Sequence, residues 1–257
     1  MIPEDKTIGD FIQAFEDLQI KYMQNVRSIE KYNDEIVRRI YYPHGLTKKD
    51  SIVREDMYLF EQAYSLVKLV FKDKKREDQR RYFEHLKGTM EITLRELPNP
   101  NLNKLIIALL HDIVEDIPGY ENVIREIYGD YIANGVEVLS KKEWESYLTT
   151  EEAEEYAITE DNKRKKELKE IGTERRNEDY FGHLDQLNDD YLDIKIADRL
   201  HNLRDMKHLT IKKIEKKLEE TKKYFLHVAE KRNPTAYALL MTEVKNLENL
   251  LQEKKNE

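Results

Sequence analysis

Hydrophobic residues recur every three or four positions over most of the chain, which is the period of an α-helix with one buried face. The clearest case lies between residues 50 and 71, where the apolar positions are Ile52, Met57, Leu59, Phe60, Ala63, Leu66, Val67 and Val70. Similar patterns predict helices ending before Pro98 and at residues 211–232 and 235–254. Only 8 Gly and 6 Pro interrupt the 257 residues, so we expect an all-α fold.

The pattern also divides the chain into parts. Residues 1–50 are predicted to form a helical extension, residues 51–232 the main domain, and residues 233–257 a C-terminal helix packed on it. Within the main domain, residues 140–190 carry runs of Glu and Lys and few apolar side chains. This composition predicts outer helices together with a mobile loop, because there is little apolar area to anchor the segment.

One stretch differs from the amphipathic pattern. Residues 105–110 are all apolar, which predicts a helix buried on every side, and four ionisable residues follow at His111, Asp112, Glu115 and Asp116. Helical spacing would place His111 above Glu115 and Asp112 above Asp116. Buried groups of this kind are tolerated when they are paired or bind a metal, so a functional site is one interpretation. The alternative is a helix whose C-terminal end simply reaches the surface.

A second stretch, residues 193–205, combines a hydrophobic stripe with polar side chains beside it. Asp198 and Asn202 lie four residues apart and therefore share a helix face, next to the apolar positions Ile194, Ala197, Leu200 and Leu203. Such a carboxylate is suited to completing a metal site. The alternative is an ordinary surface aspartate paired with Arg199 or Arg204.

Composition narrows the classes of function. The 44 Lys and Arg against 52 Asp and Glu give a formal net charge of -8, which argues against wrapping nucleic acid but allows a small anionic substrate. Without Cys, any transition metal must be bound by His and carboxylates, and a reducing compartment fits. No apolar stretch approaches the roughly 20 residues of a membrane span, and no signal peptide is evident. We expect a cytoplasmic protein with no membrane partner, while the oligomeric state stays open.

Three motifs occur in order along the chain. Arg76 and Tyr82 precede His85, at nine and three residues' distance; the second motif is Leu110-His-Asp-Ile-Val-Glu-Asp116, and the third is Lys195-Ile-Ala-Asp-Arg-Leu-His-Asn-Leu-Arg-Asp205. Together they resemble the HD-domain metal phosphohydrolases. Within that group they resemble the hydrolase domain of the RelA/SpoT guanosine tetraphosphate enzymes, especially the small stand-alone hydrolases related to the metazoan SpoT homologue.

The resemblance covers residues 57–229 and has two departures. Glu77 follows Arg76 where many members of the family have a second cation near the guanine base, and Leu86 follows His85 in place of the usual Pro. The fold that the resemblance implies is an HD-domain helical bundle, here with the N-terminal helical extension.

The resemblance also implies a metal site and a reaction. His85, His111, Asp112 and Asp198 would bind one divalent metal, and two imidazoles with two carboxylates suit Mn²⁺, with Zn²⁺, Fe²⁺ or Co²⁺ as alternatives. The implied reaction is hydrolysis of the 3′-pyrophosphate of guanosine tetra- or pentaphosphate, which gives GDP or GTP and pyrophosphate.

Further residues would serve this reaction. Glu115 and Asp116 would orient the attacking water and transfer its proton. Arg76 would contact the purine, Asn202 the ribose or a phosphate, and Tyr224 the distal phosphate. Two other functions remain as alternatives: an HD-type phosphohydrolase acting on another nucleotide, including NADPH, and a non-catalytic helical protein that binds a partner.

Overall fold

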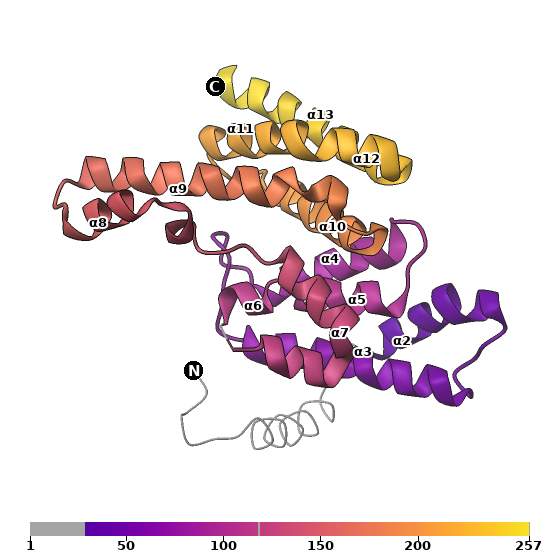
Figure 1. Ribbon diagram of the computed structural model, residues 1–257. Coiled ribbons are helices and arrows are strands. Elements are labelled where there is room, and N and C mark those ends of the chain that lie inside the picture. The colour runs from indigo at the N-terminus through magenta and orange to yellow at the C-terminus, as the bar shows by residue number, and fades with distance from the viewer. Residues whose placement is uncertain (1–28, 118, 257) are drawn as a thin grey trace, which may run out of the picture.

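The computed structural model describes residues 29–117 and 119–256 (Figure 1). The predicted all-α class is confirmed, because this part of the chain consists of helices and their connections, with a single isolated β-bridge between Lys75 and Arg81. Most of the predicted N-terminal extension, residues 1–28, lies outside the described residues. No helix in the described part has the length and apolar character needed to cross a bilayer.

The N-terminal half forms one group of helices, drawn in indigo to magenta in Figure 1. Its elements are α2 (Glu30–Ile36), η1 (Val37–Tyr41), η2 (Tyr42–His44), α3 (Ser51–Val70), α4 (Phe83–Arg95), α5 (Leu102–Leu110), α6 (Ile113–Asp116) and α7 (Glu121–Leu139).

The C-terminal half, drawn from pink through orange to yellow, lies against this group. Its elements are η3 (Trp144–Tyr147), α8 (Thr150–Ile158), α9 (Asn162–Gly182), η4 (Leu184–Gln186), α10 (Asp189–Arg204), α11 (Ile211–Glu220), η5 (Thr221–Phe225), α12 (Leu226–Arg232) and α13 (Pro234–Asn256).

Helix α5 is the centre of the N-terminal half. It packs against α3, α4, α7 and α10, and every side chain from Leu105 to Leu110 is fully buried. A helix surrounded by others on all sides has no polar face, which explains its unbroken run of apolar residues. The prediction of a helix buried all round is therefore confirmed.

Two hydrophobic clusters meet along α4 and α10. One is built from α2 to α7 and includes Leu86 of α4, whereas the other is built mainly from α10 to α13 and includes Ile92 of the same helix. Helices α4 and α10 pack directly on each other, and α10 also packs on α13. Residues on the facing sides of α4 and α10 therefore lie at the boundary between the two clusters.

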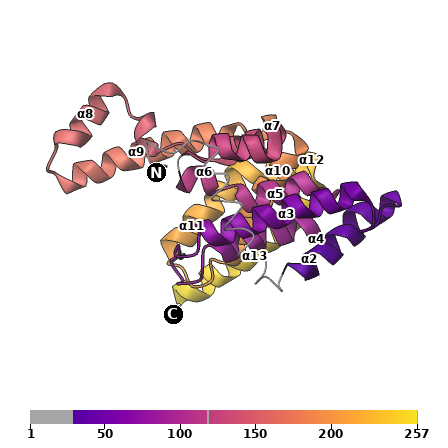
Figure 2. The same cartoon turned by 90° about the horizontal axis from the view of Figure 1, so that it is seen from below.

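Helix α7 spans residues 121–139 as one element with a kink at Gly129, whose φ of 81° only glycine adopts readily. The charged segment 140–190 forms α8 and α9, which project from the body as a hairpin (Figures 1 and 2). The outer helices predicted for this segment are therefore present as α8 and α9. The mobile loop predicted for the same segment stays a prediction.

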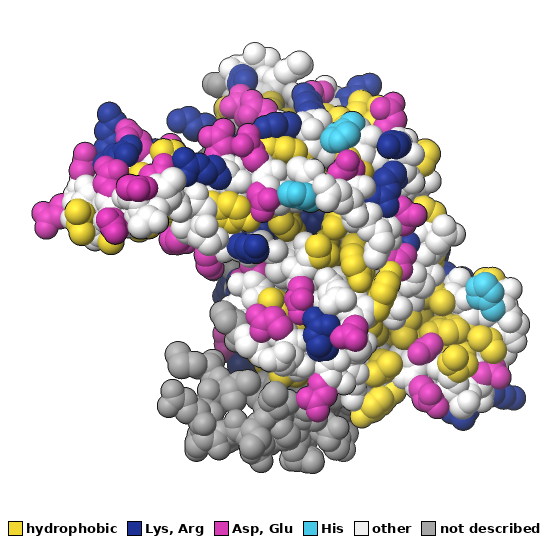
Figure 3. Space-filling view, in the orientation of Figure 1, with side chains coloured by type: hydrophobic (Ala, Val, Ile, Leu, Met, Phe, Trp, Pro, Cys, Tyr) yellow, Lys and Arg dark blue, Asp and Glu magenta, His cyan; other side chains and the backbone are white. Residues whose placement is uncertain are grey.

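The hairpin combines ion pairs with a small apolar contact, in which the ring of buried Trp144 lies 5.0 Å from the ring of Tyr156 of α8 and Leu168 of α9 is fully buried. Arg164 of α9 contacts Glu155 of α8 at 2.6 Å, and no residue of α8 is buried. Figure 3 shows acidic and basic side chains interspersed over this arm, whereas hydrophobic side chains gather on the main body. Its high content of Glu and Lys therefore reflects solvated helix faces.

A buried ion pair links α5 to α10. The Lys104 ammonium lies 2.7 Å from Oδ2 of Asp193, and both residues are about 95% buried, with exposures of 3% and 5%. Oδ1 of the same carboxylate accepts a hydrogen bond of 2.6 Å from the amide of Asn233, just before α13. One carboxylate thus connects three segments that are distant in sequence.

Replacing Lys104 by Met should lower the free energy of unfolding by about 3 kcal/mol, because the buried Asp193 carboxylate loses its cation. Urea denaturation followed by circular dichroism measures this change. The control is Lys222→Met, which removes an exposed ion pair with Glu248 and should alter stability only slightly. Equal losses in the two variants would contradict a structural role for the buried pair.

Candidate metal centre and its cleft

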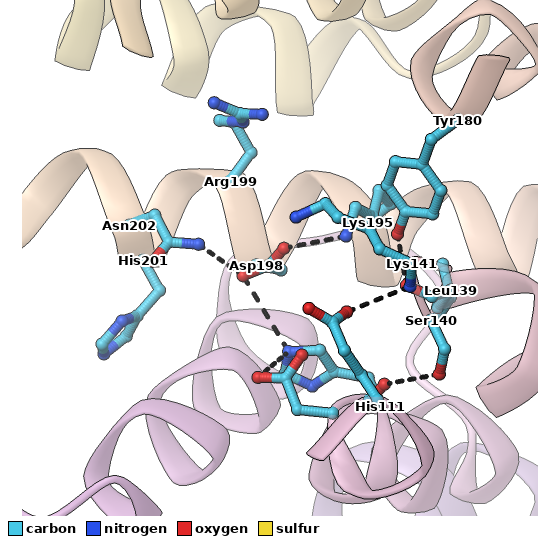
Figure 4. A network of polar contacts seen from close by, with 12 residues as sticks. His111, Leu139, Ser140, Lys141, Tyr180, Lys195, Asp198, Arg199, His201 and Asn202 are labelled. Atoms are coloured by element: carbon cyan, nitrogen blue, oxygen red, sulfur yellow. Dashed lines mark hydrogen bonds and ion pairs between the residues drawn. The ribbon is translucent and has the colours of Figure 1, made fainter. Parts of the chain in front are cut away.

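The four predicted metal ligands come from three segments and meet at the boundary of the two hydrophobic clusters. His85 lies in the first turn of α4, and His111 and Asp112 form the turn between α5 and α6. Asp198 lies on α10, and Figure 4 shows it together with His111. The continuous helix expected through His111 is thus interrupted, since α5 ends at Leu110.

Nitrogen and oxygen atoms of these residues converge. Nε2 of His85 lies 3.2 Å from Oδ1 of Asp198 and 3.7 Å from Oδ2 of Asp112. Nε2 of His111 lies 3.3 Å from the same oxygen of Asp112 and 3.9 Å from Oδ1 of Asp198. Within the described part of the chain, His85, His111 and Asp112 form the one group whose ligand atoms all lie within 4.8 Å of one another.

The hydrogen bonding of His111 fits a bound metal. Its Nδ1 lies 2.8 Å from the carbonyl oxygen of Ala108, an acceptor, so Nδ1 carries the proton and Nε2 presents a lone pair. This Nε2 is buried and has no hydrogen-bond partner, although an unsatisfied buried polar atom is costly. A metal at the convergence point would satisfy it, and two imidazoles with two carboxylates are a suitable donor set.

The electrostatic surroundings favour the protonation states of Asp198 and His85 that a metal site would need. Burial acts to raise the pKa of Asp198, but the Lys195 ammonium, 3.1 Å from Oδ2, holds that pKa well below its ordinary value. Burial lowers the pKa of His85 and so favours the neutral imidazole. An ionised carboxylate and a neutral imidazole are the forms that bind metals.

Other side chains orient these ligands. The Tyr82 hydroxyl donates to Oδ2 of Asp112 at 2.6 Å, and the amide of Asn202 donates to Oδ1 of Asp198 at the same distance. Nδ1 of His201 lies 3.0 Å from Nδ1 of His85, so the second ring nitrogen of His85 also has a partner. Such contacts fix ring orientation in metal sites.

Gly88 allows His201 to reach His85. A Cβ atom built on Gly88, one turn after His85 in α4, would lie 2.1 Å from two ring atoms of His201. Only a residue without a side chain permits α10 to bring this imidazole so close to α4. The close approach of the two helices and the orientation of His85 therefore depend on the same position.

The two predicted water-handling acids lie in different surroundings. Glu115 lines the cleft, and its Oε2 accepts a hydrogen bond of 3.0 Å from the backbone N–H of Lys141. Asp116 forms an ion pair with Lys74 and is not among the residues that line the cleft. The structure thus brings Glu115, but not Asp116, to the cleft beside the candidate ligands.

The cleft above the ligands has a volume of about 620 Å³. Arg76 and Asn202, predicted to contact substrate, both line it, and Nη2 of Arg76 donates to Oδ1 of Asn202 at 2.9 Å. Tyr224 lines the adjacent groove between α9 and α11, where its ring stacks on Phe181 at 5.4 Å. Sequence reasoning therefore located two of the three substrate candidates in the main cleft.

Some residues of the site were missed by sequence reasoning. Lys195 and His201 both contact predicted ligands, and both lie within the third motif. The spacing of Lys195, three residues before Asp198, was a usable signal because such residues share a helix face. Lys141 and Arg176, which line the cleft from the charged segment, had no such signal.

Comparisons with known proteins agree with this geometry at the level of the fold. No protein-family model matches the chain, and no curated protein matches its sequence at a significant level. Among solved structures, the chain is similar to a metazoan ortholog of SpoT that hydrolyses guanosine tetraphosphate and plays a role in starvation responses. The TM-score is 0.57 at 17% sequence identity, over 73% of this chain and 94% of the other. The chain therefore has a SpoT-like hydrolase fold, as its motifs predicted.

Replacing Gly88 by Ala should weaken binding of a divalent metal such as Mn²⁺ by at least about tenfold, because the new methyl group displaces His201 from His85. Titration calorimetry with the purified protein measures the affinity, and circular dichroism checks the helix content. Gly182→Ala is the control, since nothing lies within 4 Å of its added Cβ. Unchanged affinity in Gly88→Ala would show that His201 does not position His85.

Proposed function

We propose that this protein hydrolyses the 3′-pyrophosphate of guanosine tetra- or pentaphosphate and releases GDP or GTP and pyrophosphate. One observation carries the proposal: two histidine nitrogens and two carboxylates converge at the base of a cleft that is also lined by several cations. The SpoT-like hydrolase fold supports a phosphohydrolase, and the three sequence motifs support this substrate.

The proposed metal is Mn²⁺, held by His85, His111, Asp112 and Asp198, with another divalent transition metal as the alternative. When bound, it would activate water and offset phosphate charge. Tyr82 and Asn202 hold the two carboxylates in place through the hydrogen bonds described above. Their fixed orientation lowers the rearrangement needed when substrate binds.

In the proposed reaction, the oxygen of a water molecule bonds to the phosphorus nearest the ribose while the bond from that phosphorus to the 3′ oxygen breaks. Glu115 is the proposed group that orients the water and accepts its proton, because its carboxylate lines the cleft and is anchored by the Lys141 N–H. The departing 3′ oxygen takes up a proton. Asp116 stays a candidate for proton transfer, acting from its ion pair with Lys74.

Substrate positioning is assigned to the rim of the cleft. Arg76 presents a planar guanidinium that suits a purine face, and Asn202 holds it in place. The second candidate substrate is a different nucleotide, including NADPH. Glu77 is the residue that supports this alternative. This acid stands where the resemblance implies a cation near guanine, and it is engaged by Lys213 at 2.6 Å.

Incubation of the purified protein and Mn²⁺ with guanosine tetraphosphate should release pyrophosphate and GDP, measured by anion-exchange chromatography. Asp112→Ala should lose both the bound ion, about one per chain, and the activity. Glu115→Gln should retain the ion but lose about 10²-fold or more in kcat, because the proton acceptor is removed.

The outcomes separate the alternatives. Activity on another nucleotide but not on guanosine tetraphosphate would reject the substrate and keep the class of enzyme. A protein that neither binds Mn²⁺ nor cleaves any nucleotide in a panel that includes NADPH would reject catalysis and favour a helical partner-binding protein.

A further inference from the structure

Lys74 lies in the connection between α3 and α4 and is not among the residues that line the cleft. It faces Tyr82 across the base of a short loop. The backbone N–H of Tyr82 donates to the carbonyl oxygen of Lys74 at 2.9 Å, and the isolated β-bridge between Lys75 and Arg81 lies next to this bond. The backbone contacts therefore fix where Lys74 and Tyr82 stand relative to each other.

The Lys74 side chain lies over the ring of Tyr82. Its ammonium is 4.0 Å from the centroid of this ring and 5.6 Å from the centroid of the Phe71 ring. The two rings are 5.1 Å apart, and Phe71 is 1% exposed. A cation over an aromatic face is attracted by the π electrons of the ring. The Tyr82 ring is thus held by a buried aromatic side chain and by the Lys74 ammonium.

The same ammonium forms an ion pair with Asp116. Asp116 is the last residue of α6, the single turn of helix that follows Asp112, and its backbone N–H donates to the carbonyl oxygen of Asp112 at 3.0 Å. Because the carboxylate of Asp116 and the ring of Tyr82 both attract the ammonium, Lys74 is fixed between them.

The Tyr82 hydroxyl carries this arrangement to a candidate ligand. It donates to Oδ2 of Asp112 at 2.6 Å, and this oxygen lies 3.3 Å from Nε2 of His111 and 3.7 Å from Nε2 of His85. A carboxylate can rotate about its side-chain bonds, and a hydrogen bond to one of its oxygens restricts that rotation. Lys74 therefore acts on both ends of α6, on Asp116 directly and on Asp112 through Tyr82.

We propose that Lys74 is a positioning residue for the candidate metal centre. Asp116 fixes the Lys74 ammonium, the ammonium holds the Tyr82 ring, and the Tyr82 hydroxyl keeps the Asp112 carboxylate turned toward the two histidines. This inference rests on the proposed function, because it takes Asp112 as a ligand of the metal. It also gives Asp116 a contribution to the site that needs no proton transfer.

The charge of Lys74 and its positioning effect predict opposite changes in metal affinity. A cation near the site repels a divalent ion and neutralises Asp116, which would attract one, so charge alone predicts tighter metal binding when Lys74 is replaced. Loss of the orientation of Asp112 predicts weaker metal binding. The direction of the change therefore decides between the two effects.

The first test measures Mn²⁺ binding to the purified protein by titration calorimetry, without substrate. Lys74→Met should weaken binding by about fivefold, because the ring of Tyr82 loses its cation. Lys74→Arg should restore most of the affinity, since a guanidinium also stacks on aromatic rings and pairs with carboxylates. Circular dichroism checks the helix content of each variant.

Lys72→Met is the matched control. Lys72 lies in the same connection, its side chain is exposed, and its ammonium is 3.8 Å from the exposed carboxylate of Asp73. The Mn²⁺ affinity of this variant should equal that of the unaltered protein, although it loses the same charge.

A double variant tests whether Lys74 acts through Tyr82. Tyr82→Phe keeps the ring but removes the hydroxyl, and it should weaken Mn²⁺ binding by about tenfold. Adding Lys74→Met to this variant should change the affinity by less than about twofold, because the ring no longer carries a donor for Asp112. Two independent effects would instead multiply to about fiftyfold.

Unchanged or tighter Mn²⁺ binding in Lys74→Met would overturn the proposal. Multiplied effects in the double variant, or no Mn²⁺ binding by the unaltered protein, would overturn it as well. Hydrolysis of guanosine tetraphosphate is assayed separately. A protein that shows the expected pattern of Mn²⁺ affinities but cleaves no guanosine tetraphosphate would refute the proposed substrate and leave the role of Lys74 in place.

Discussion

The contact between α4 and α10 is the constraint on which the rest of the site depends. These two helices join the hydrophobic clusters of the two halves, and they carry His85 and Asp198 on their facing sides. Gly88 permits the helices to approach closely enough for His201 to reach His85. Because side-chain packing in a core resists small displacements, the geometry of the ligands is set by the same contact that closes the fold.

The candidate ligands illustrate what sequence can predict. A buried apolar helix followed by His111 and Asp112 indicated a polar site beside a core, and the third motif supplied Asp198, because periodicity and motif order are properties of the chain itself. The residues that each side chain contacts are not a property of the chain alone, because they depend on how the chain folds. Asp116 pairs with Lys74 of the connection before α4, and Tyr224 stacks on Phe181 at the end of α9. Both contacts depend on how segments that are distant in sequence pack against each other.

The net charge of the chain and the charge along one wall of the cleft have opposite signs. The chain carries a formal charge of -8, yet the wall opposite the candidate ligands holds Lys141, Arg176 and Lys217 with Glu220 as its acid. Surface charges more than about 10 Å apart are screened in physiological salt, whereas charges around a partly enclosed cleft act on one another strongly. The interspersed charges on the α8–α9 hairpin contribute to the total without determining the potential inside the cleft. An acidic composition and an anionic substrate are therefore compatible.

The distribution of the candidate ligands would also couple metal binding to the joining of the two halves. His85, His111 and Asp112 belong to the N-terminal group of helices, whereas Asp198 belongs to α10, which packs on α4, α5 and α7 as well as on α13. An ion held by all four residues would bridge the clusters and stabilise the assembled form over any state in which α4 and α10 separate. Without the ion, two carboxylates converge near Nε2 of His85, and Lys195 is the fixed cation that offsets their charge. The Nε2 atom of His111, which is buried without a hydrogen-bond partner, is the atom of this cluster that a bound ion would satisfy.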